Sequence, residues 1–194
     1  MNPTIELLLT RRSVAAKDLG EPGPDAEQLR TILQAAHRVP DHGKLGPWRF
    51  IVFEGEQRRL FGNELATIFA NDNPDSSEKL LSFESARFMR APLIIALIAS
   101  AHEDHPKIPL WEQQLCLGAV AQNLLTASHA MGFGAQWLTE WYSYHREVNN
   151  LLGLQTSERV AGFFYIGTPQ FAPSERVRPE LDERVSFWQG RHQK

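Results

Sequence analysis

Hydrophobic residues recur every three or four positions over most of the chain, which is the spacing of one face of an α-helix. The first such segment is short and follows Thr4, a residue type that commonly caps a helix N-terminus, and the second opens at Asp25. The longest segment would extend over about 30 Å at 1.5 Å per residue. Helices are predicted over residues 5–9, 25–37, 56–71, 78–88, 109–131 and 144–152.

Other segments have the composition of β-strands, and they cover residues 48–53, 92–99, 135–141 and 159–166. Residues 92–99 are the most hydrophobic stretch and are expected to form a central strand. Residues 48–53 show little polar–apolar alternation, so we expect that strand to be buried on both faces. Because strands and helices do not alternate strictly, the sequence predicts an α+β domain rather than a doubly wound sheet.

Composition narrows the possible partners. The 194 residues suit a single domain over 1–194, and 42% hydrophobic with 22% charged residues is typical of a soluble globular protein. The net charge of −3 argues against nucleic acid as the main partner. No apolar run is long enough for a membrane span, and the N-terminus lacks the pattern of a signal peptide. The single cysteine, Cys116, excludes an internal disulfide and suits the cytoplasm, which is the expected location.

The connection between the second helix and the first predicted strand, residues 38–50, has an unusual composition. It contains two glycines, two prolines, Trp48 and the cationic or imidazole side chains of Arg38, His42, Lys44 and Arg49. A loop of this kind often carries chemistry on a rigid scaffold. A polar surface turn is an equally good interpretation of these residues alone.

A pair of arginines followed by serine, Arg11-Arg12-Ser13, ends the first helix. Guanidinium groups match phosphate oxygens, and the serine hydroxyl adds a neutral donor. Taken alone, a solvated basic pair at a helix C-terminus is the more common situation, because the helix dipole favours cations there.

Signatures of several enzyme classes are missing, including the dinucleotide-binding Gly-x-Gly-x-x-Gly, the phosphate loop and the hydrolase Gly-x-Ser-x-Gly. His102, Asp104 and His105 have a spacing that permits metal binding, but no further ligand cluster accompanies them. No metal site is therefore predicted. The tail from residue 170 to 194 carries apolar residues without a core of its own, which indicates that it covers a surface of this subunit or of another.

Five motifs in chain order resemble the FMN-dependent nitroreductase family. They are Arg11-Arg12-Ser13, Pro40-Asp41-His42 with Pro47-Trp48-Arg49-Phe50, Gly132-Phe133-Gly134-Ala135-Gln136-Trp137, Phe164-Tyr165-Ile166-Gly167-Thr168-Pro169, and Arg178-Pro179-Glu180-Leu181-Asp182-Glu183. The Pro-Asp-His loop and Pro109-Leu110-Trp111-Glu112-Gln113 are most similar to the short, provisionally named NAD(P)H nitroreductases of bacteria.

The resemblance implies a central mixed, mainly antiparallel sheet flanked by helices in an intertwined homodimer. Two FMN molecules would lie at the interface, and the arm of residues 170–194 would pack on the partner subunit. From one subunit, the FMN phosphate and ribityl chain would be held by Arg11, Arg12 and Ser13. The other subunit would contribute Arg38 and His42. The flavin ring would be lined by Trp137, Leu138 and Thr139.

The same resemblance implies a ping-pong reaction in which NADH or NADPH delivers hydride to the flavin N5, so that no side chain is expected as a catalytic nucleophile. A nitroaromatic, quinone or similar electron-poor acceptor would then be reduced. The nicotinamide nucleotide would lie along Ala127, Ser128, His129, Ala130, Met131 and Gly132. Alternatives are another flavin reaction on this fold, such as dehalogenation or ene reduction, and flavin binding without turnover. Many family members carry Asn and Gln where this chain has Lys44 and Gly46, so acceptor preference does not follow from the resemblance.

Overall fold

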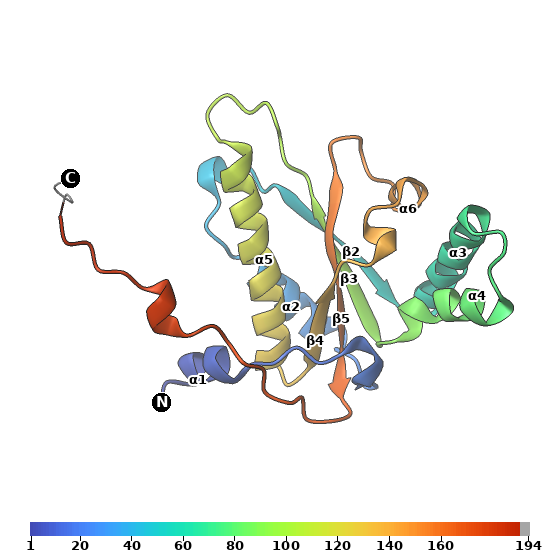
Figure 1. Cartoon of the computed structure of the whole chain (residues 1–194), viewed down its shortest axis with the longest axis horizontal. Coiled ribbons are helices and arrows are strands. Elements are labelled where there is room, and N and C mark those ends of the chain that lie inside the picture. The colour runs from blue at the N-terminus through green and yellow to red at the C-terminus, as the bar shows by residue number, and fades with distance from the viewer. Residues whose placement is uncertain (191–194) are drawn as a thin grey trace.

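The computed structural model describes residues 1–190 and contains helices on both sides of one sheet (Figure 1). The helices are α1 (Pro3–Thr10), α2 (Ala26–His37), α3 (Glu56–Asp72), α4 (Glu78–Ser85), α5 (Leu110–Ala130) and α6 (Arg146–Leu151). The strands are β1 (Leu19–Gly20), β2 (Trp48–Glu54), β3 (Leu93–Ala99), β4 (Gly134–Leu138) and β5 (Arg159–Pro169). None of the described helices combines the length and apolarity needed to cross a membrane.

Strand β5 connects most of the sheet. The strand order is β1-β5-β3-β2, β4 also pairs with β5, and every described pairing is antiparallel. Strand β3 lies between β5 and β2 and is buried from Leu93 to Ile98. The predictions of a mainly antiparallel sheet in an α+β domain and of a central strand at 92–99 are therefore confirmed.

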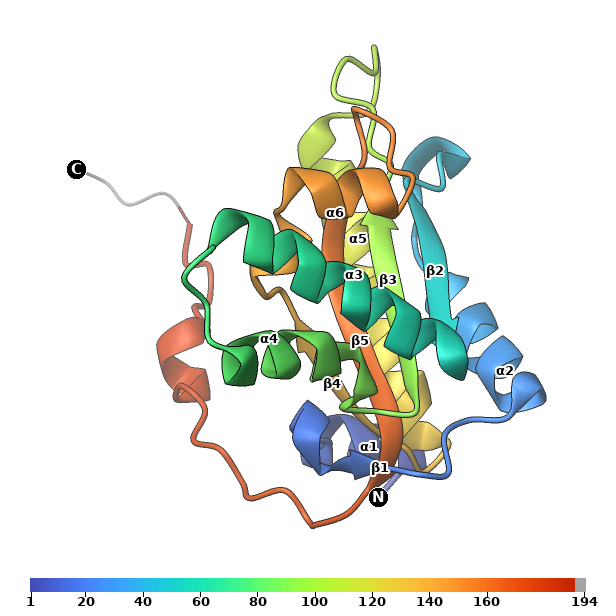
Figure 2. The same ribbon diagram turned by 90° about the vertical axis from the view of Figure 1, so that its right-hand side faces the viewer.

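Alternate residues of β3 supply two separate cores, because successive strand side chains point to opposite faces. Leu93, Ile95 and Leu97 pack with residues of α2 and α5. Ile94, Ala96 and Ile98 pack with residues of α3, α6 and the segment after α4. Figure 2 shows α3 and α4 in front of the sheet and α5 behind it. The sheet is thus the middle of three layers.

The prediction that residues 48–53 are buried on both faces is wrong. Strand β2 lies at the edge of the sheet, and Phe53 is its one fully buried residue. The remaining apolar residues are half-buried, because no described strand covers the outer side of β2. Its apolar run reflects partial cover by helices rather than a central position.

The predicted start of the first helix also differs. Asn2, not Thr4, is the N-cap, and its side chain accepts a hydrogen bond from the Thr4 backbone N–H at 2.9 Å, with Pro3 in the first turn. Proline suits that position because the first helical N–H groups have no partner within the helix. Asp25 does cap α2 and forms a capping box with Gln28.

Candidate functional site

The segment that follows α1 lies along β4. The backbone N–H of Val14 donates to the Ala135 carbonyl at 3.1 Å, and that of Ala16 donates to Oε1 of Gln136 at 2.6 Å. These bonds bring Arg11-Arg12-Ser13 to the start of the strand that ends in Trp137 and Leu138. Two sets of predicted site residues, more than 120 positions apart, therefore belong to one region of the protein.

A cavity of about 450 Å³ lies at this junction, between the end of α1, the end of α5 and the beginning of the C-terminal tail. Its lining includes Arg11, Arg12 and His129. The Nη1 atom of Arg11 is buried without a hydrogen-bond partner among the described residues. Leaving a buried charged donor unsatisfied is costly, so this atom fits an anionic ligand such as the phosphate of FMN.

The guanidinium of Arg12 contacts the tail. Its Nε donates to the Ser174 carbonyl at 3.0 Å and lies 3.7 Å from a carboxylate oxygen of Glu175. Ser13 is exposed beside it. The arm therefore begins directly over the arginine pair.

His129 joins α5 to the arginine segment. Its Nδ1 lies 2.7 Å from the Leu125 carbonyl and its Nε2 lies 2.7 Å from the Arg12 carbonyl. These two contacts hold the end of α5 against the arginine segment.

Trp137 lies flat against β5. Its ring stacks on Phe164 with centroids 5.3 Å apart, and its Nε1 donates to the Ala161 carbonyl at 3.1 Å. A Cβ atom at Gly162 would lie 1.9 Å from Nε1, so the ring needs glycine beneath it. The indole is 41% exposed and offers its outer side to a planar ligand. Leu138 is half-buried and Thr139 is exposed.

A buried polar cluster follows immediately after Thr139. Glu140 accepts hydrogen bonds from Arg87, Arg90 and Tyr142, and Arg90 also bonds to Tyr165. Burial acts to raise the pKa of Glu140, but the hydrogen bonds from Arg90 and Tyr142 outweigh it, so that pKa lies below its ordinary value. The cluster fixes the chain directly after the predicted ring-lining residues.

Arg38 and His42 lie elsewhere along α5. The Arg38 carbonyl accepts from Nδ2 of Asn123 at 3.0 Å, and Nδ1 of His42 lies 2.6 Å from Oε2 of Glu112. At 1.5 Å per residue, Glu112 lies about 25 Å and Asn123 about 9 Å from His129 along the helix axis. Neither Arg38 nor His42 lines the cavity beside the arginine pair, so within one chain the structure does not bring them to it.

The loop that carries His42 has an uncommon backbone. Gly43, Lys44 and Gly46 all have positive φ, at 70°, 56° and 56°. The Gly46 N–H donates to Oδ2 of Asp41 at 2.8 Å, which closes the loop. Positive φ strains residues with a Cβ atom, so glycine suits position 46, while Lys44 adopts the strained conformation and remains exposed.

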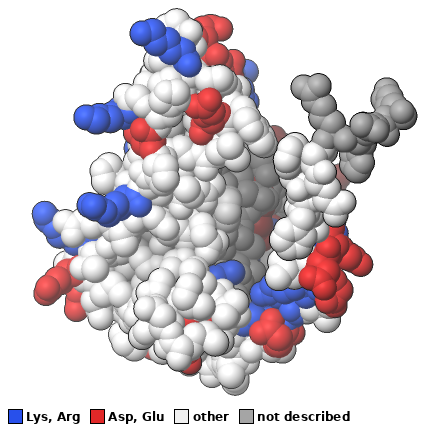
Figure 3. Space-filling view, turned by 90° about the vertical axis from the view of Figure 1, so that its left-hand side faces the viewer, with Lys and Arg blue, Asp and Glu red and all other residues white. Residues whose placement is uncertain are grey.

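The outward face of α5 is apolar and uncovered. Trp111 and Leu115 are exposed at helical spacing, and a Cβ atom at Gly118 would meet open space. Figure 3 shows the molecule from this side, where a broad uncharged surface lies between charged margins. The arm adds further exposed apolar residues, namely Phe171, Val177, Leu181, Val185, Phe187 and Trp188. Residues 191–194 of the predicted arm lie outside the described residues.

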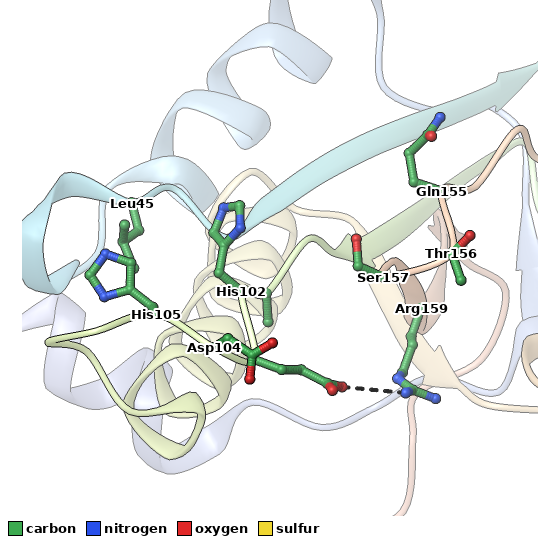
Figure 4. Close-up of a pocket in the computed structure, with 10 residues that line it drawn as sticks. Leu45, His102, Asp104, His105, Gln155, Thr156, Ser157 and Arg159 are labelled. Atoms are coloured by element: carbon green, nitrogen blue, oxygen red, sulfur yellow. Dashed lines mark ion pairs between the residues drawn. The ribbon is translucent and has the colours of Figure 1, made fainter.

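The segment considered for metal binding forms part of a separate cavity of about 870 Å³. His102 and His105 point in different directions there, and the ion pair drawn joins Glu103 to Arg159 at 3.5 Å (Figure 4). Nδ1 of His105 accepts from the Ile108 N–H at 2.9 Å. Within residues 1–190, no group of three or more His, Cys, Asp or Glu side chains is placed to hold a metal ion.

The predicted nicotinamide segment, residues 127–132, ends α5 beside the same cavity as the arginine pair. Ser128 is fully buried and donates to the Leu124 carbonyl at 2.8 Å. Ala130 and Gly132 are exposed, and Met131 is half-buried. The exposed positions are the ones available to a ligand.

Three contributors to this region were not predicted from the sequence. Gln136 holds the arginine segment through Ala16, Glu112 contacts His42, and Glu140 anchors the end of β4. The Pro-x-Trp-Glu-Gln segment contains Glu112, but no neighbouring residue in the sequence indicated that its partner is His42. Glu140 is recognisable only once Arg87 and Arg90 are placed beside it.

The sequence of this chain is similar to those of proteins whose family is known. The sequence profile described as the nitroreductase family matches residues 8–168. A protein of Escherichia coli K12 with the provisional name NAD(P)H nitroreductase YdjA is 38% identical over 187 residues, which covers 95% of this chain and 98% of that protein.

Solved structures share the fold. A nitroreductase-like family protein from Bacillus cereus has a TM-score of 0.82 at 21% identity, with 98% of each chain covered. A provisionally named nitroreductase from Desulfovibrio desulfuricans in complex with FMN has a TM-score of 0.72 at 22% identity, covering 95% of this chain and 96% of that one. The NADPH:FMN oxidoreductase of Vibrio harveyi, complexed with NAD+, has a TM-score of 0.73 at 23% identity, covering 100% of this chain and 80% of that one. The chain therefore belongs to the nitroreductase family.

Proposed function

We propose that this protein binds FMN and uses NADH or NADPH to reduce nitroaromatic compounds, quinones or similar electron-poor acceptors by a ping-pong mechanism. The observation that supports FMN most directly is the buried Nη1 of Arg11, which has no partner among the described residues and lines a cavity beside β4. An anionic phosphate would satisfy it. The family membership of the chain supports the redox chemistry.

Two groups of residues contact different parts of the cofactor. Arg11, Arg12 and the Ser13 hydroxyl bind the phosphate and ribityl side, and residues 137–139 contact the flavin ring, partly through backbone groups. FMN, when bound, takes up hydride from the nicotinamide and passes two electrons to the acceptor. The protein orients these partners and excludes water. Reductant and acceptor use one face in turn, with the nicotinamide nucleotide against residues 127–132.

The site is proposed to be completed by a second copy of the chain. His42 contacts α5 about 25 Å from His129, and Arg38 does not line the cavity beside the arginine pair, yet Arg38 and His42 are assigned to the same FMN as that pair. The uncovered apolar face of α5 provides a surface for pairing, and an intertwined dimer would place Arg38 and His42 of one subunit at the FMN of the other. The arm of residues 170–194, exposed in one chain, would pack on the partner subunit.

The test of this proposal is the visible spectrum of the purified protein before and after addition of NADPH without air. Bound flavin whose absorbance bleaches supports an FMN oxidoreductase, and an acceptor panel with product analysis then separates nitro and quinone reduction from dehalogenation or ene reduction. Bound flavin without bleaching by NADPH or NADH would indicate a flavin binder without this turnover. Protein that takes up no FMN would contradict the proposal.

Arg11→Ala tests the phosphate contact. Loss of charge-assisted hydrogen bonds worth about 1.5–3 kcal/mol should raise the Kd for FMN about 10- to 150-fold. The matched control is Arg146→Ala, which removes an exposed arginine from α6. Equal FMN content in the two purified variants would contradict the assignment of Arg11, provided that circular dichroism shows both to be folded.

A further inference from the structure

We propose that Glu112 is a positioning residue that holds His42 as a hydrogen-bond donor toward FMN at the subunit interface. The inference rests on the proposed function, because it requires His42 to contact the FMN held by the partner subunit. Its basis is the 2.6 Å contact between Oε2 of Glu112 and Nδ1 of His42, two residues 70 positions apart.

The backbone around His42 is fixed without Glu112. The side chain of Asp41 closes the loop onto Gly46, and Sγ of Cys116 lies 3.1 Å from the Pro40 carbonyl. Gly43 packs so closely on Ile108 that a Cβ atom there would lie 2.4 Å from its side chain. What remains free is the rotation and protonation of the imidazole, and Glu112 determines both.

A carboxylate that accepts a hydrogen bond from Nδ1 requires that Nδ1 carry the proton, which leaves Nε2 available to a ligand. The phosphate and carbonyl oxygens of FMN accept hydrogen bonds, so Nε2 must also be protonated to donate to them. His42 would then be a cation whose charge is balanced by Glu112. The same arrangement of a second residue that orients an imidazole is common where histidines act on ligands.

Other ionisable groups near His42 do not replace this carboxylate. Asp41 and Lys44 belong to its own loop, and the carboxylate of Asp41 is bonded to Gly46. Cys116 belongs to α5, and burial raises the pKa of its thiol, which keeps it neutral. The pair borders a hollow of about 300 Å³ on the face of α5 that a second copy is proposed to cover.

Glu112→Gln separates the two roles of the carboxylate. Glutamine keeps an oxygen that can accept from Nδ1, but it removes the charge that stabilises the imidazolium. Both side chains are exposed, at 63% for His42 and 45% for Glu112, so water screens the attraction between them. The variant should therefore bind FMN about two- to fivefold more weakly than the wild type.

The experiment measures the Kd for FMN by quenching of flavin fluorescence at pH 7. Glu112→Gln should bind FMN about two- to fivefold more weakly than wild type, and Glu112→Ala, which also removes the acceptor at Nδ1, should bind it more weakly still. Glu64→Gln, at an exposed glutamate on α3 across the sheet from α5, should match wild type.

The double variant with His42→Asn decides whether Glu112 acts through His42. In that background, Glu112→Gln should leave the Kd unchanged. Equal Kd values for wild type and Glu112→Gln, in protein whose FMN binding depends on His42, would overturn this inference and leave the proposed function intact. If His42→Asn binds FMN like wild type, the assignment of His42 fails and this inference with it. Wild-type protein that binds no FMN would overturn both.

Discussion

Gly162→Ala should destabilise the protein by displacing the ring of Trp137. The added methyl carbon would lie 1.9 Å from Nε1 and 2.4 Å from Cδ1, so the indole must move outward by more than 1 Å to reach an ordinary contact distance. That movement breaks the hydrogen bond to Ala161, worth about 0.5–1.5 kcal/mol, and the stacking on Phe164, worth about the same. Alanine adds backbone strain of about 1 kcal/mol, because the φ of 157° at this position is one that residues with a Cβ atom rarely adopt.

The net loss in the free energy of unfolding should be about 2–4 kcal/mol, or a fall in Tm of about 4–16 °C for a chain of this size. Denaturant unfolding of flavin-free protein, followed by circular dichroism, measures it. In a Trp137→Ala background the obstacle is gone, so Gly162→Ala should cost only the backbone strain of about 1 kcal/mol. An equal loss in both backgrounds would refute the reasoning, because it would show that the methyl group conflicts with something other than the indole.

Three further changes test other parts of the structure. The hydrogen bond from Arg49 lowers the pKa of Glu158 from an ordinary 4.5 to about 2, so its stabilisation is present above pH 4.5 and lost as pH falls toward 2. Glu158→Gln should lower the free energy of unfolding at pH 7 by about 1–2 kcal/mol, a value reduced for the partial exposure of Arg49. In acid titrations, the free energy of unfolding of the variant should fall less steeply than that of the wild type between about pH 5 and 2. Gly62→Ala would place a Cβ atom 2.0 Å from the Ser85 carbonyl oxygen, which belongs to the backbone and cannot rotate away. The free energy of unfolding, measured in urea, should fall by about 1–3 kcal/mol. An unchanged urea midpoint would contradict the close packing of α3 on α4. His129→Ala removes the imidazole that bridges the Leu125 and Arg12 carbonyls beside the proposed phosphate site. It should weaken FMN binding about fivefold, as measured by fluorescence quenching, whereas an unchanged Kd would show that this bridge does not position the arginine segment.

The elements that could be predicted are those whose signal is local. The apolar run of β3 and the long helical pattern of α5 are continuous in sequence, and both were placed within a few residues of their observed bounds. The burial of β2 was predicted wrongly because position in a sheet depends on neighbours, not on the strand itself. The two residues of β1 were expected to be loop, since their strand conformation comes from pairing with the end of β5.

The same distinction applies to the candidate site. Arg11 and Arg12 were recognisable because an arginine pair beside serine is itself suited to phosphate. The contact of Glu112 with His42 spans 70 positions, and Glu140 is 50 residues from Arg90, so neither pairing has a local pattern. Long-range pairing of this kind is determined by the packing of α5 and the segment after α4, which no single stretch of sequence contains.

The position of β5 in the chain has a consequence for synthesis on the ribosome. Strand β5 bonds to β1, β3 and β4, yet it is translated after all of them. Until residue 169 has left the exit tunnel, the nascent protein can form the β2–β3 ribbon but has no partner for the other edge of β3. An apolar strand with an open edge is prone to pair with other chains. The interval between the emergence of β3 and that of β5 is therefore when the nascent chain is most exposed to mispairing, and a slow codon run just before Arg159 would lengthen it.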